Sequence, residues 1–246
     1  MIGDPHQHVK LVRRIINFEQ SDYVVVLGDW FDSHVYFSKQ DALDTAIFVK
    51  HFLFTENCFS LIGNHDLPYL YANPSTICSG YSKTTNDTVN EVFGKDFQQI
   101  REKFKWFLWI DDWFVSHGGL HTNHFPPIWK TVNKQTVTEF LNDQIKQAEI
   151  TLINNGTHWL YRSGKARGGT QPIGGLTWLD FRKEFVPIEE FRQIVGHTYM
   201  GQTVKTHVEN GSLDIHDCDL CIDTQLCEYL IITSGKIEVK KSIDIY

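Results

Sequence analysis

Five short segments of the sequence carry aspartate, histidine and asparagine side chains that could bind metal ions or transfer protons. In chain order they are residues 3–6 (GDPH), 28–32 (GDWFD), 63–66 (GNHD), 117–120 (HGGL) and 196–198 (GHT). Carboxylates and imidazoles together suit manganese, iron or zinc. A carboxylate has two oxygens and can bridge two metals, and an imidazole titrates near neutral pH. The set could therefore combine metal binding with acid–base chemistry.

Apolar runs precede four of these segments and predict the strands that position them. Each run ends where a polar segment begins, and the runs cover residues 23–27, 59–62, 113–116 and 191–195. In open α/β sheets, ligands gather at the carboxyl ends of strands. A lone aspartate or histidine at a strand end is usually a turn residue, but five such segments in this order favour one shared site.

The first segment has little chain before it. Only Met1 and Ile2 precede Gly3, which predicts either a very short first strand or a strand whose beginning lies outside this sequence. Asp4 would then be held less firmly than the other candidate ligands.

Helices are predicted on either side of these strands. Residues 10–19 have apolar side chains at helical spacing. Ser38 with Asp41 forms a capping-box pattern that opens a second helix. Residues 67–105 are polar and rich in threonine and asparagine, and become helical from about Lys95. We interpret them as an insertion, or lid, over the site.

The second half of the chain predicts a hairpin, a long helix, a loop and further strands. Asp111-Asp112 separates two β-runs, residues 107–110 and 113–116, and indicates a hairpin turn. Thr136 and Glu139 form a second capping box that opens a helix. A glycine-rich loop follows at residues 164–175. Further strands are expected at residues 203–208, 220–223, 229–233 and 237–240, with a turn at Ser234-Gly235 between the last two.

The composition is that of one folded domain over residues 1–246. Apolar residues make up 41% and aromatic residues 13% of the chain, which supports a substantial core and excludes a disordered chain. The formal net charge of −7 argues against a long nucleic acid as partner, because such a partner needs many Lys or Arg contacts. No apolar run reaches membrane length and no signal segment opens the chain, so no membrane association is expected.

The five cysteines favour free thiols in a reducing compartment, and hence a cytoplasmic protein. Cys218-x-x-Cys221, with His216 and Cys227 nearby, could suggest structural zinc. No second C-x-x-C accompanies the pair, however, and residues 220–223 fit a strand. We therefore set a structural zinc site aside.

In order, the five segments read GD-x-H, GD-x-x-D, GNHD, HGG and GHT, and they resemble the calcineurin-like metallophosphoesterase superfamily. The resemblance spans residues 3–198. The HGGL and single-histidine GHT forms are similar to the branch that holds Ser/Thr protein phosphatases and symmetrical diadenosine tetraphosphate hydrolases; other branches have a second histidine where this chain has Tyr199. The resemblance implies an α/β fold in which two mixed β-sheets pack as a sandwich flanked by helices.

The resemblance also implies a role for each matched residue. His65 would be a general acid near the leaving oxygen, and Asp32 would steady it. Two divalent metal ions would be bound, with Asp29 bridging both. Manganese is the first expectation for these ions, and iron, zinc or nickel are the alternatives. The remaining implied ligands are Asp4 and His6 for the first metal, and Asn64, His117 and His197 for the second.

The sequence departs from the protein-phosphatase pattern at the residue that usually binds the substrate phosphate. Ser33-His34 stand where an Arg-Gly pair usually follows Asp32. We expect Arg167, in the glycine-rich loop, to bind the substrate phosphate instead, with Arg162 as the second choice.

Several residues beside the motifs could also line the pocket, although other roles are favoured. Trp30 could stack on a substrate ring but is expected to pack in the core. Surface or supporting roles are expected for the neighbouring histidines His8, His34, His121 and His124.

We expect a metal-dependent phosphoesterase that hydrolyses phosphomonoesters in the manner of protein phosphatases, acting on a phosphorylated protein or a small phosphoester. The alternative is a diadenosine polyphosphate or other phosphoanhydride hydrolase, which the missing Arg after Asp32 and the aromatic Trp30 favour. A nuclease or cyclic phosphodiesterase is disfavoured by the charge and by Tyr199. A non-catalytic binding module of the same fold is a further alternative, although every implied ligand position is filled. No pattern indicates the oligomeric state.

Overall fold

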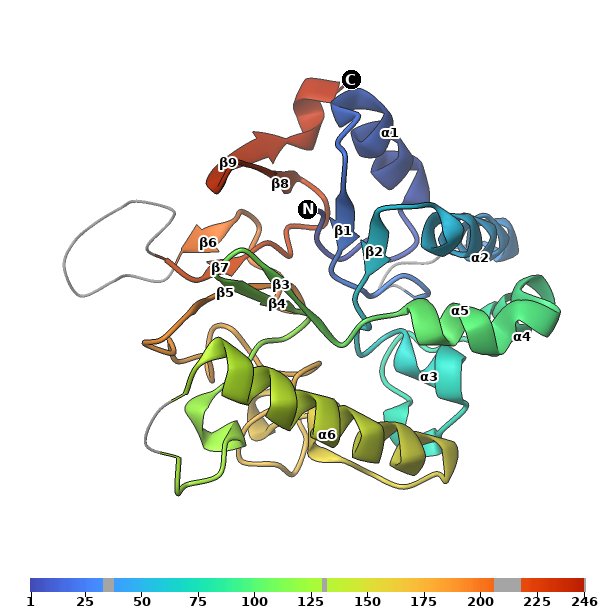
Figure 1. Ribbon diagram of the computed structural model, residues 1–246. Helices are drawn as coiled ribbons and strands as arrows, with labels where there is room; N and C mark the ends of the chain where they lie inside the picture. The colour runs from blue at the N-terminus through green and yellow to red at the C-terminus, as the bar shows by residue number, and fades with distance from the viewer. Residues whose placement is uncertain (33–37, 130–131, 206–217, 246) are drawn as a thin grey trace.

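Two mixed β-sheets pack face to face, with helices on the outside of both (Figure 1). The computed structural model describes residues 1–32, 38–129, 132–205 and 218–245. In Figure 1, α1 (Val9–Glu19) and α2 (Lys39–Phe54) lie beside one sheet, and α6 (Lys134–Ile153) crosses the opposite side of the molecule. The predicted α/β sandwich is therefore confirmed.

The first sheet joins the two ends of the chain. β1 (Val24–Val26) pairs in parallel with β2 (Cys58–Ser60), and β8 (Glu228–Thr233) pairs antiparallel with β9 (Lys236–Lys241). Ile2 connects the two pairs, because it bridges Val26 in parallel and Tyr229 antiparallel. The chain before Asp4 thus contributes a single bridge residue to the sheet.

The second sheet supplies the other wall of the sandwich. Its strands lie in the order β3-β4-β5-β7-β6, and the pairs β4–β5 and β5–β7 are parallel while the two outer pairs are antiparallel. Its strands are β3 (Phe107–Ile110), β4 (Trp113–Ser116), β5 (Arg192–Val195), β6 (Val204–Lys205) and β7 (Leu220–Cys221). The β3–β4 hairpin has the predicted bounds. Residues 206–208 of one predicted strand lie outside the described residues.

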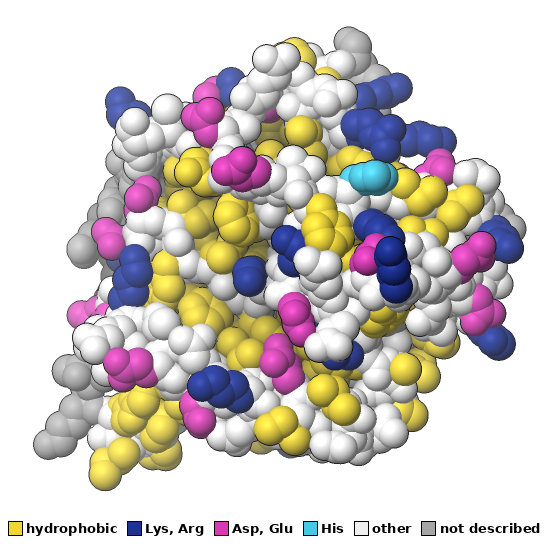
Figure 2. Space-filling view, turned by 45° about the vertical axis from the view of Figure 1, so that its right-hand side comes forward, with side chains coloured by type: hydrophobic (Ala, Val, Ile, Leu, Met, Phe, Trp, Pro, Cys, Tyr) yellow, Lys and Arg dark blue, Asp and Glu magenta, His cyan; other side chains and the backbone are white. Residues whose placement is uncertain are grey.

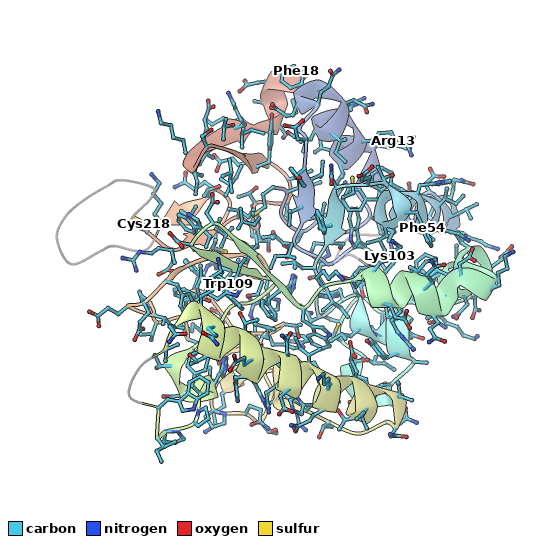
Figure 3. All side chains as sticks on the ribbon, in the orientation of Figure 1. Arg13, Phe18, Phe54, Lys103, Trp109 and Cys218 are labelled. Carbon is cyan, nitrogen blue, oxygen red and sulfur yellow. The ribbon has the colours of Figure 1, made fainter. Side chains whose placement is uncertain are left out.

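Apolar side chains from both sheets form the sandwich core. Figure 3 labels one of them, Cys218, at the end of the chain segment that leads into β7. The core consists of Val25, Leu27, Leu61, Trp113, Val115, Ile194, Cys218, Leu220, Ile222, Leu230 and Ile237.

The first two helices follow the predicted pattern. α1 buries Val9, Val12 and Ile15 on one stripe. The capping box before α2 is confirmed, since the Ser38 side chain accepts a hydrogen bond from the Asp41 N–H and the Asp41 carboxylate accepts one from the Ser38 N–H.

Residues 67–105, the predicted insertion, are more helical than the sequence predicts. It contains α3 (Leu67–Tyr71), α4 (Lys83–Phe93) and α5 (Phe97–Lys103). The prediction of helix only from about Lys95 is wrong for α4, a helix rich in threonine and asparagine that is capped by Ser82. Its buried residues include Val89 and Phe93, which join the main core, so tertiary packing outweighs weak helix propensity.

The long helix α6 begins two residues before the predicted cap. Asn133 is the N-cap, and its side-chain oxygen accepts from the Thr136 N–H at 3.0 Å while the Thr136 hydroxyl accepts from the Asn133 N–H at 3.1 Å. Thr136 is therefore the third helical residue, and its prediction as the cap is wrong. The helix contacts the second sheet through Trp109, labelled in Figure 3, whose Nε1 donates to Thr138 Oγ1 at 2.9 Å.

Charge is mixed on the face drawn in Figure 2. Lys and Arg side chains are interspersed there with Asp, Glu and apolar side chains, and no extended basic stripe crosses that face. Within the part of the chain that the structure describes, every helix is too short or too polar to span a bilayer.

Replacing Ile194 by alanine should lower the free energy of unfolding by about 2–5 kcal/mol, because it removes methyl and methylene groups from a fully buried position in the sandwich core. Ile128→Ala makes the same chemical change where the side chain is 83% exposed, and should alter stability by less than about 0.5 kcal/mol. Urea unfolding followed by circular dichroism measures both. Equal midpoints for the two variants would contradict this account of the core.

Candidate metal centre

The predicted strand-end segments converge in the fold. The His6 N–H donates to the Asp29 carbonyl at 2.8 Å, and the Gly196 N–H donates to the His117 carbonyl at 2.7 Å. The polar loops that follow strands of the two sheets therefore lie close together. The structure thus brings these segments together, and the shared site stays a prediction.

The backbone at two of the candidate ligands is unusual. Asp29 has a φ of 61° and His197 a φ of 62°, in the left-handed region that residues other than glycine rarely adopt. Such a conformation costs about 1–3 kcal/mol and persists only where the surroundings hold it in place. Asp29 is the third residue after the end of β1 and His197 the second after the end of β5, so both strained positions lie in loops that leave the strands.

Asp66 holds the strained turn at Asp29. Its carboxylate accepts three backbone N–H bonds, from Asp29 at 2.8 Å, from Trp30 at 2.8 Å and from Gly63 at 2.9 Å. Burial, together with the Asp29 charge, raises the pKa of Asp66 to about 7. Sequence reasoning assigned Asp66 no role, although its place in the GNHD segment could have suggested one.

The first group of possible ligands comprises Asp4, His6 and Asp29, whose ligand atoms all lie within 4.8 Å of one another. The His6 Nδ1 atom lies 2.8 Å from the Asp32 carbonyl, which turns Nε2 toward the Asp29 carboxylate at 3.9 Å. Asp4 is buried and accepts from the His197 N–H at 2.8 Å. Despite the short first strand, Asp4 is therefore firmly held.

The second group comprises Asp29, His117 and His197, also within 4.8 Å. The His117 Nδ1 atom lies 2.7 Å from the Leu27 carbonyl, and Nε2 lies 3.0 Å from Asn64 Oδ1 and 3.3 Å from Asp29 Oδ2. Asp29 thus belongs to both groups. The Oδ2 atom of Asp29 faces both His6 and His117, one ligand from each group.

The charges in the centre are strongly coupled. Burial raises the pKa of Asp29, but His117 and His65 outweigh it and hold that pKa well below its usual value. Burial and the Asp223 carboxylate raise the pKa of Asp4 well above its usual value. The pKa of His117 rises to about 9 because Asp29 and Asp4 outweigh its burial.

These residues fit divalent metal ions. Two buried ligand atoms, Asp4 Oδ1 and His197 Nε2, have no hydrogen-bond partner among the described residues. An unsatisfied buried polar atom costs roughly 1–3 kcal/mol, and a metal ion would satisfy both. The donors are carboxylate, imidazole and amide groups, which suit manganese, iron or zinc.

A histidine–aspartate pair lies beside the metal groups. His65 Nδ1 contacts an oxygen of the Asp32 carboxylate, and the Tyr69 hydroxyl donates to the other oxygen at 3.4 Å. Burial lowers the pKa of His65, but the charge of Asp29 and the bond to Asp32 prevail and hold it well above its usual value. The predicted pairing of His65 with Asp32 is present.

Residues 1–199 match the calcineurin-like phosphoesterase family. The chain belongs to this family. Its members use divalent metals, in agreement with the ligand groups above. None of the curated proteins matches the sequence.

Solved structures share the fold of this calcineurin-like phosphoesterase at low identity. The cold-active protein-tyrosine phosphatase of a psychrophilic Shewanella species superposes with a TM-score of 0.61 at 14% identity, over 98% of this chain and 76% of that chain. A point mutant of that enzyme gives 0.62 at the same identity and coverage. A metallophosphoesterase from Sphaerobacter thermophilus gives 0.45 at 16% identity, over 98% of this chain and 86% of that one. At these identities the likeness shows the fold alone.

A pocket of about 490 Å³ adjoins the metal groups of this phosphoesterase. His65 and His197 lie in its lining together with both predicted phosphate-binding residues, Arg162 and Arg167. Residues 75–79, within the predicted insertion, form part of the wall. The structure therefore brings the two arginines to the side of the site that holds His65, and the role of the insertion as a lid stays a prediction.

Arg167 is better fixed than Arg162. Its Nε lies 2.7 Å from the Asp180 carboxylate, and one terminal nitrogen donates to Thr198 Oγ1 at 3.0 Å. Arg162 donates to Thr170 Oγ1 at 2.9 Å.

Some residues that neighbour the motifs in the sequence contact other parts of the fold. Trp30 is fully buried, and its Nε1 donates to Ser60 Oγ at 2.7 Å, so the possibility that it stacks on a substrate is wrong. His124 joins two loops, since its Nε2 lies 2.9 Å from the Gly174 carbonyl and its Nδ1 accepts from the His121 N–H at 3.1 Å. His34 lies outside the described residues.

One carboxylate near the centre was not predicted, and two cysteines had been considered as zinc ligands and set aside. Asp223 follows β7 and is buried beside Asp4; the rule that polar residues follow strands could have found it. Cys218 and Cys221 are buried and form no disulfide with each other, and neither belongs to a possible metal group within the described ranges. His216 is outside those ranges.

Gly196→Ala should weaken metal binding, because the added methyl carbon would lie 2.2 Å from Asp4 Oδ1 and displace that carboxylate. We expect manganese affinity, measured by titration calorimetry, to fall by at least about 10-fold, the smallest effect usual for disturbing a ligand's support.

Gly156→Ala is the matched control, since its nearest atoms lie at 3.2 Å or more around Thr151. It should bind manganese like the unchanged protein. Equal affinities for the two variants would show that the position of Asp4 does not matter to the centre.

Proposed function

We propose that this protein hydrolyses phosphomonoesters, in the manner of protein phosphatases, with a water molecule activated by two divalent metal ions. The observation that carries the proposal is the shared carboxylate of Asp29, which lies in both ligand groups beside the His65–Asp32 pair. Asp4 and His6 would complete the first metal site, and Asn64, His117 and His197 the second. Manganese is the preferred ion.

The charge of the centre favours a phosphate ligand. Two divalent ions bring four positive charges, against the two negative charges of Asp4 and Asp29. The loaded site therefore attracts a phosphate dianion although the chain as a whole carries −7. When bound, such ions lower the pKa of water from about 15.7 to about 7 and so supply the nucleophile.

His65 is the proposed general acid. Its Nδ1 faces Asp32, which leaves Nε2 as the nitrogen that can give a proton to the leaving oxygen. Asp29 and Asp32 hold the pKa of His65 well above its usual value, which favours the protonated ring that this role requires.

Arg167 is the proposed phosphate clamp. The bonds to Asp180 and Thr198 hold its guanidinium in place before substrate binds, and it shares the pocket lining with His65 and His197. An ordered guanidinium recognises phosphate oxygens at low entropic cost. Arg162, on the same pocket, is the second candidate.

The proposed substrates are a phosphorylated protein or a small phosphoester. One solved structure of the same fold is named as a protein-tyrosine phosphatase, which supports including phosphotyrosyl peptides among the candidates. None of the five cysteines forms a disulfide in the described part of the chain, which supports the proposal of a reducing, cytoplasmic setting. Residues 67–105 are proposed as the lid of the site.

A phosphoanhydride hydrolase, acting for example on a diadenosine polyphosphate, is the second candidate. The presence of Arg162 and Arg167 on one pocket favours it, because two cations could hold successive phosphates. Initial rates of the manganese-loaded protein on a phosphotyrosyl peptide, a phosphoseryl peptide and a diadenosine polyphosphate separate the two candidates.

Replacing His65 by alanine should lower the rate on phenyl phosphate by about 10²–10⁴, the usual contribution of a general acid. The loss should shrink to less than about 10-fold on 2,4-dinitrophenyl phosphate, because a weakly basic leaving group departs without a proton. Steady-state kinetics on the two esters measure the difference.

His51→Ala, on the exposed side of α2, is the control and should keep full activity on both esters. An equal loss for His65→Ala on the two leaving groups would refute proton donation. Full activity of His65→Ala on both would refute the assignment of the site.

A further inference from the structure

A third group of possible ligands differs in chemistry from the two around Asp29. Asp32, His65 and Cys78 place one ligand atom each within 4.8 Å of one another. The groups around Asp29 contain only oxygen and nitrogen donors, whereas this one includes a thiol. His65 and Cys78 belong to neither of the other groups.

The spacing of the sulfur and nitrogen fits a tetrahedral metal. Cys78 Sγ lies 3.5 Å from His65 Nδ1. Zinc bonds of about 2.3 Å to sulfur and 2.0–2.1 Å to nitrogen, at a tetrahedral angle, place those two atoms about 3.5 Å apart. The Asp32 oxygen is hydrogen-bonded to the same nitrogen and would separate from it to about 3.4 Å when both bind one ion.

The group can be reached from solvent. Cys78 is half-buried, and both Cys78 and His65 lie in the lining of the pocket of about 490 Å³. Asp32 lies behind His65 and is buried. Three protein ligands and an open pocket leave a fourth position for water, as in zinc sites that are not purely structural.

We propose that Asp32, His65 and Cys78 form an inhibitory site for a soft divalent cation of the zinc class. Binding replaces the protons on Cys78 Sγ and His65 Nδ1, which pass to solvent, and the Asp32 carboxylate becomes a ligand. No oxidation or reduction is involved.

Binding of the cation at this site prevents His65 from donating a proton. Asp32 then contacts the cation instead of the His65 N–H, and the ring no longer forms the imidazolium that protonates a leaving oxygen. This consequence rests on the proposed function, whereas the binding itself does not.

The thiolate makes the site selective. Manganese and magnesium prefer oxygen ligands, while zinc accepts thiolate and imidazole together. A protein loaded with manganese at Asp29 should therefore stay active until zinc is added. The same protein would then lose activity without losing manganese.

The first experiment titrates zinc into the manganese-loaded protein during hydrolysis of phenyl phosphate. Measured relative to its own rate without zinc, Cys78→Ser should need at least about 10-fold more zinc for half-inhibition, since disturbing even the support of a metal ligand costs about 10–100-fold in affinity. Cys227→Ser, at an exposed thiol, is the matched control and should respond to zinc like the unchanged protein. Equal zinc sensitivity of all three proteins would overturn the proposal, because zinc would then act by replacing manganese.

The second experiment needs no turnover. Cobalt added to the manganese-loaded protein should produce a thiolate-to-cobalt charge-transfer absorption in the near ultraviolet. The unchanged protein and Cys227→Ser should show the band, and Cys78→Ser should lack it. Absence of the band in the unchanged protein would overturn the site, whereas a band without any hydrolysis would refute the proposed function and leave the site standing.

Discussion

The structure depends on the placement of one carboxylate, that of Asp29, in a backbone conformation that aspartate rarely adopts. Asp66 fixes this conformation by accepting three N–H bonds from the loops after β1 and β2. In return, Asp29 Oδ1 accepts the His65 N–H at 2.9 Å. The two loops are therefore locked to each other by reciprocal bonds, and the same bonds set the distance between the proposed bridging ligand and the proposed acid.

That placement is costly without cations. Asp4, Asp29 and Asp223 are buried close enough for their charges to affect one another, and buried charge is unfavourable unless it is compensated. His117 compensates part of it, as its raised pKa shows. Bound divalent ions would compensate the rest. The strained turns at Asp29 and His197 would then position two of the ligands of these ions.

The sequence predicted what local rules determine. The β3–β4 hairpin and the Ser38 cap follow from turn and capping patterns, and the convergence of the five polar segments follows from their places at strand ends, whereas the individual ligands were implied by the family resemblance. Prediction from the sequence failed where tertiary packing determines the local structure. The helix α4 forms because Val89 and Phe93 reach the core. The misplaced cap of α6 is instead a local matter, because the Asn133 side chain accepts the Thr136 N–H while the Thr136 hydroxyl accepts the Asn133 N–H. Trp30, a candidate for stacking by its place in a motif, is fully buried, and burial of that kind depends on contacts distant in sequence.

The most direct test of the shared carboxylate is the number and strength of manganese sites, measured by titration calorimetry of metal-free protein. The unchanged protein should bind two ions per chain. His197→Ala should lose one site and keep the other, while Asp29→Ala should weaken both sites together. Two sites of unchanged affinity in Asp29→Ala would contradict the central claim that Asp29 bridges the centre.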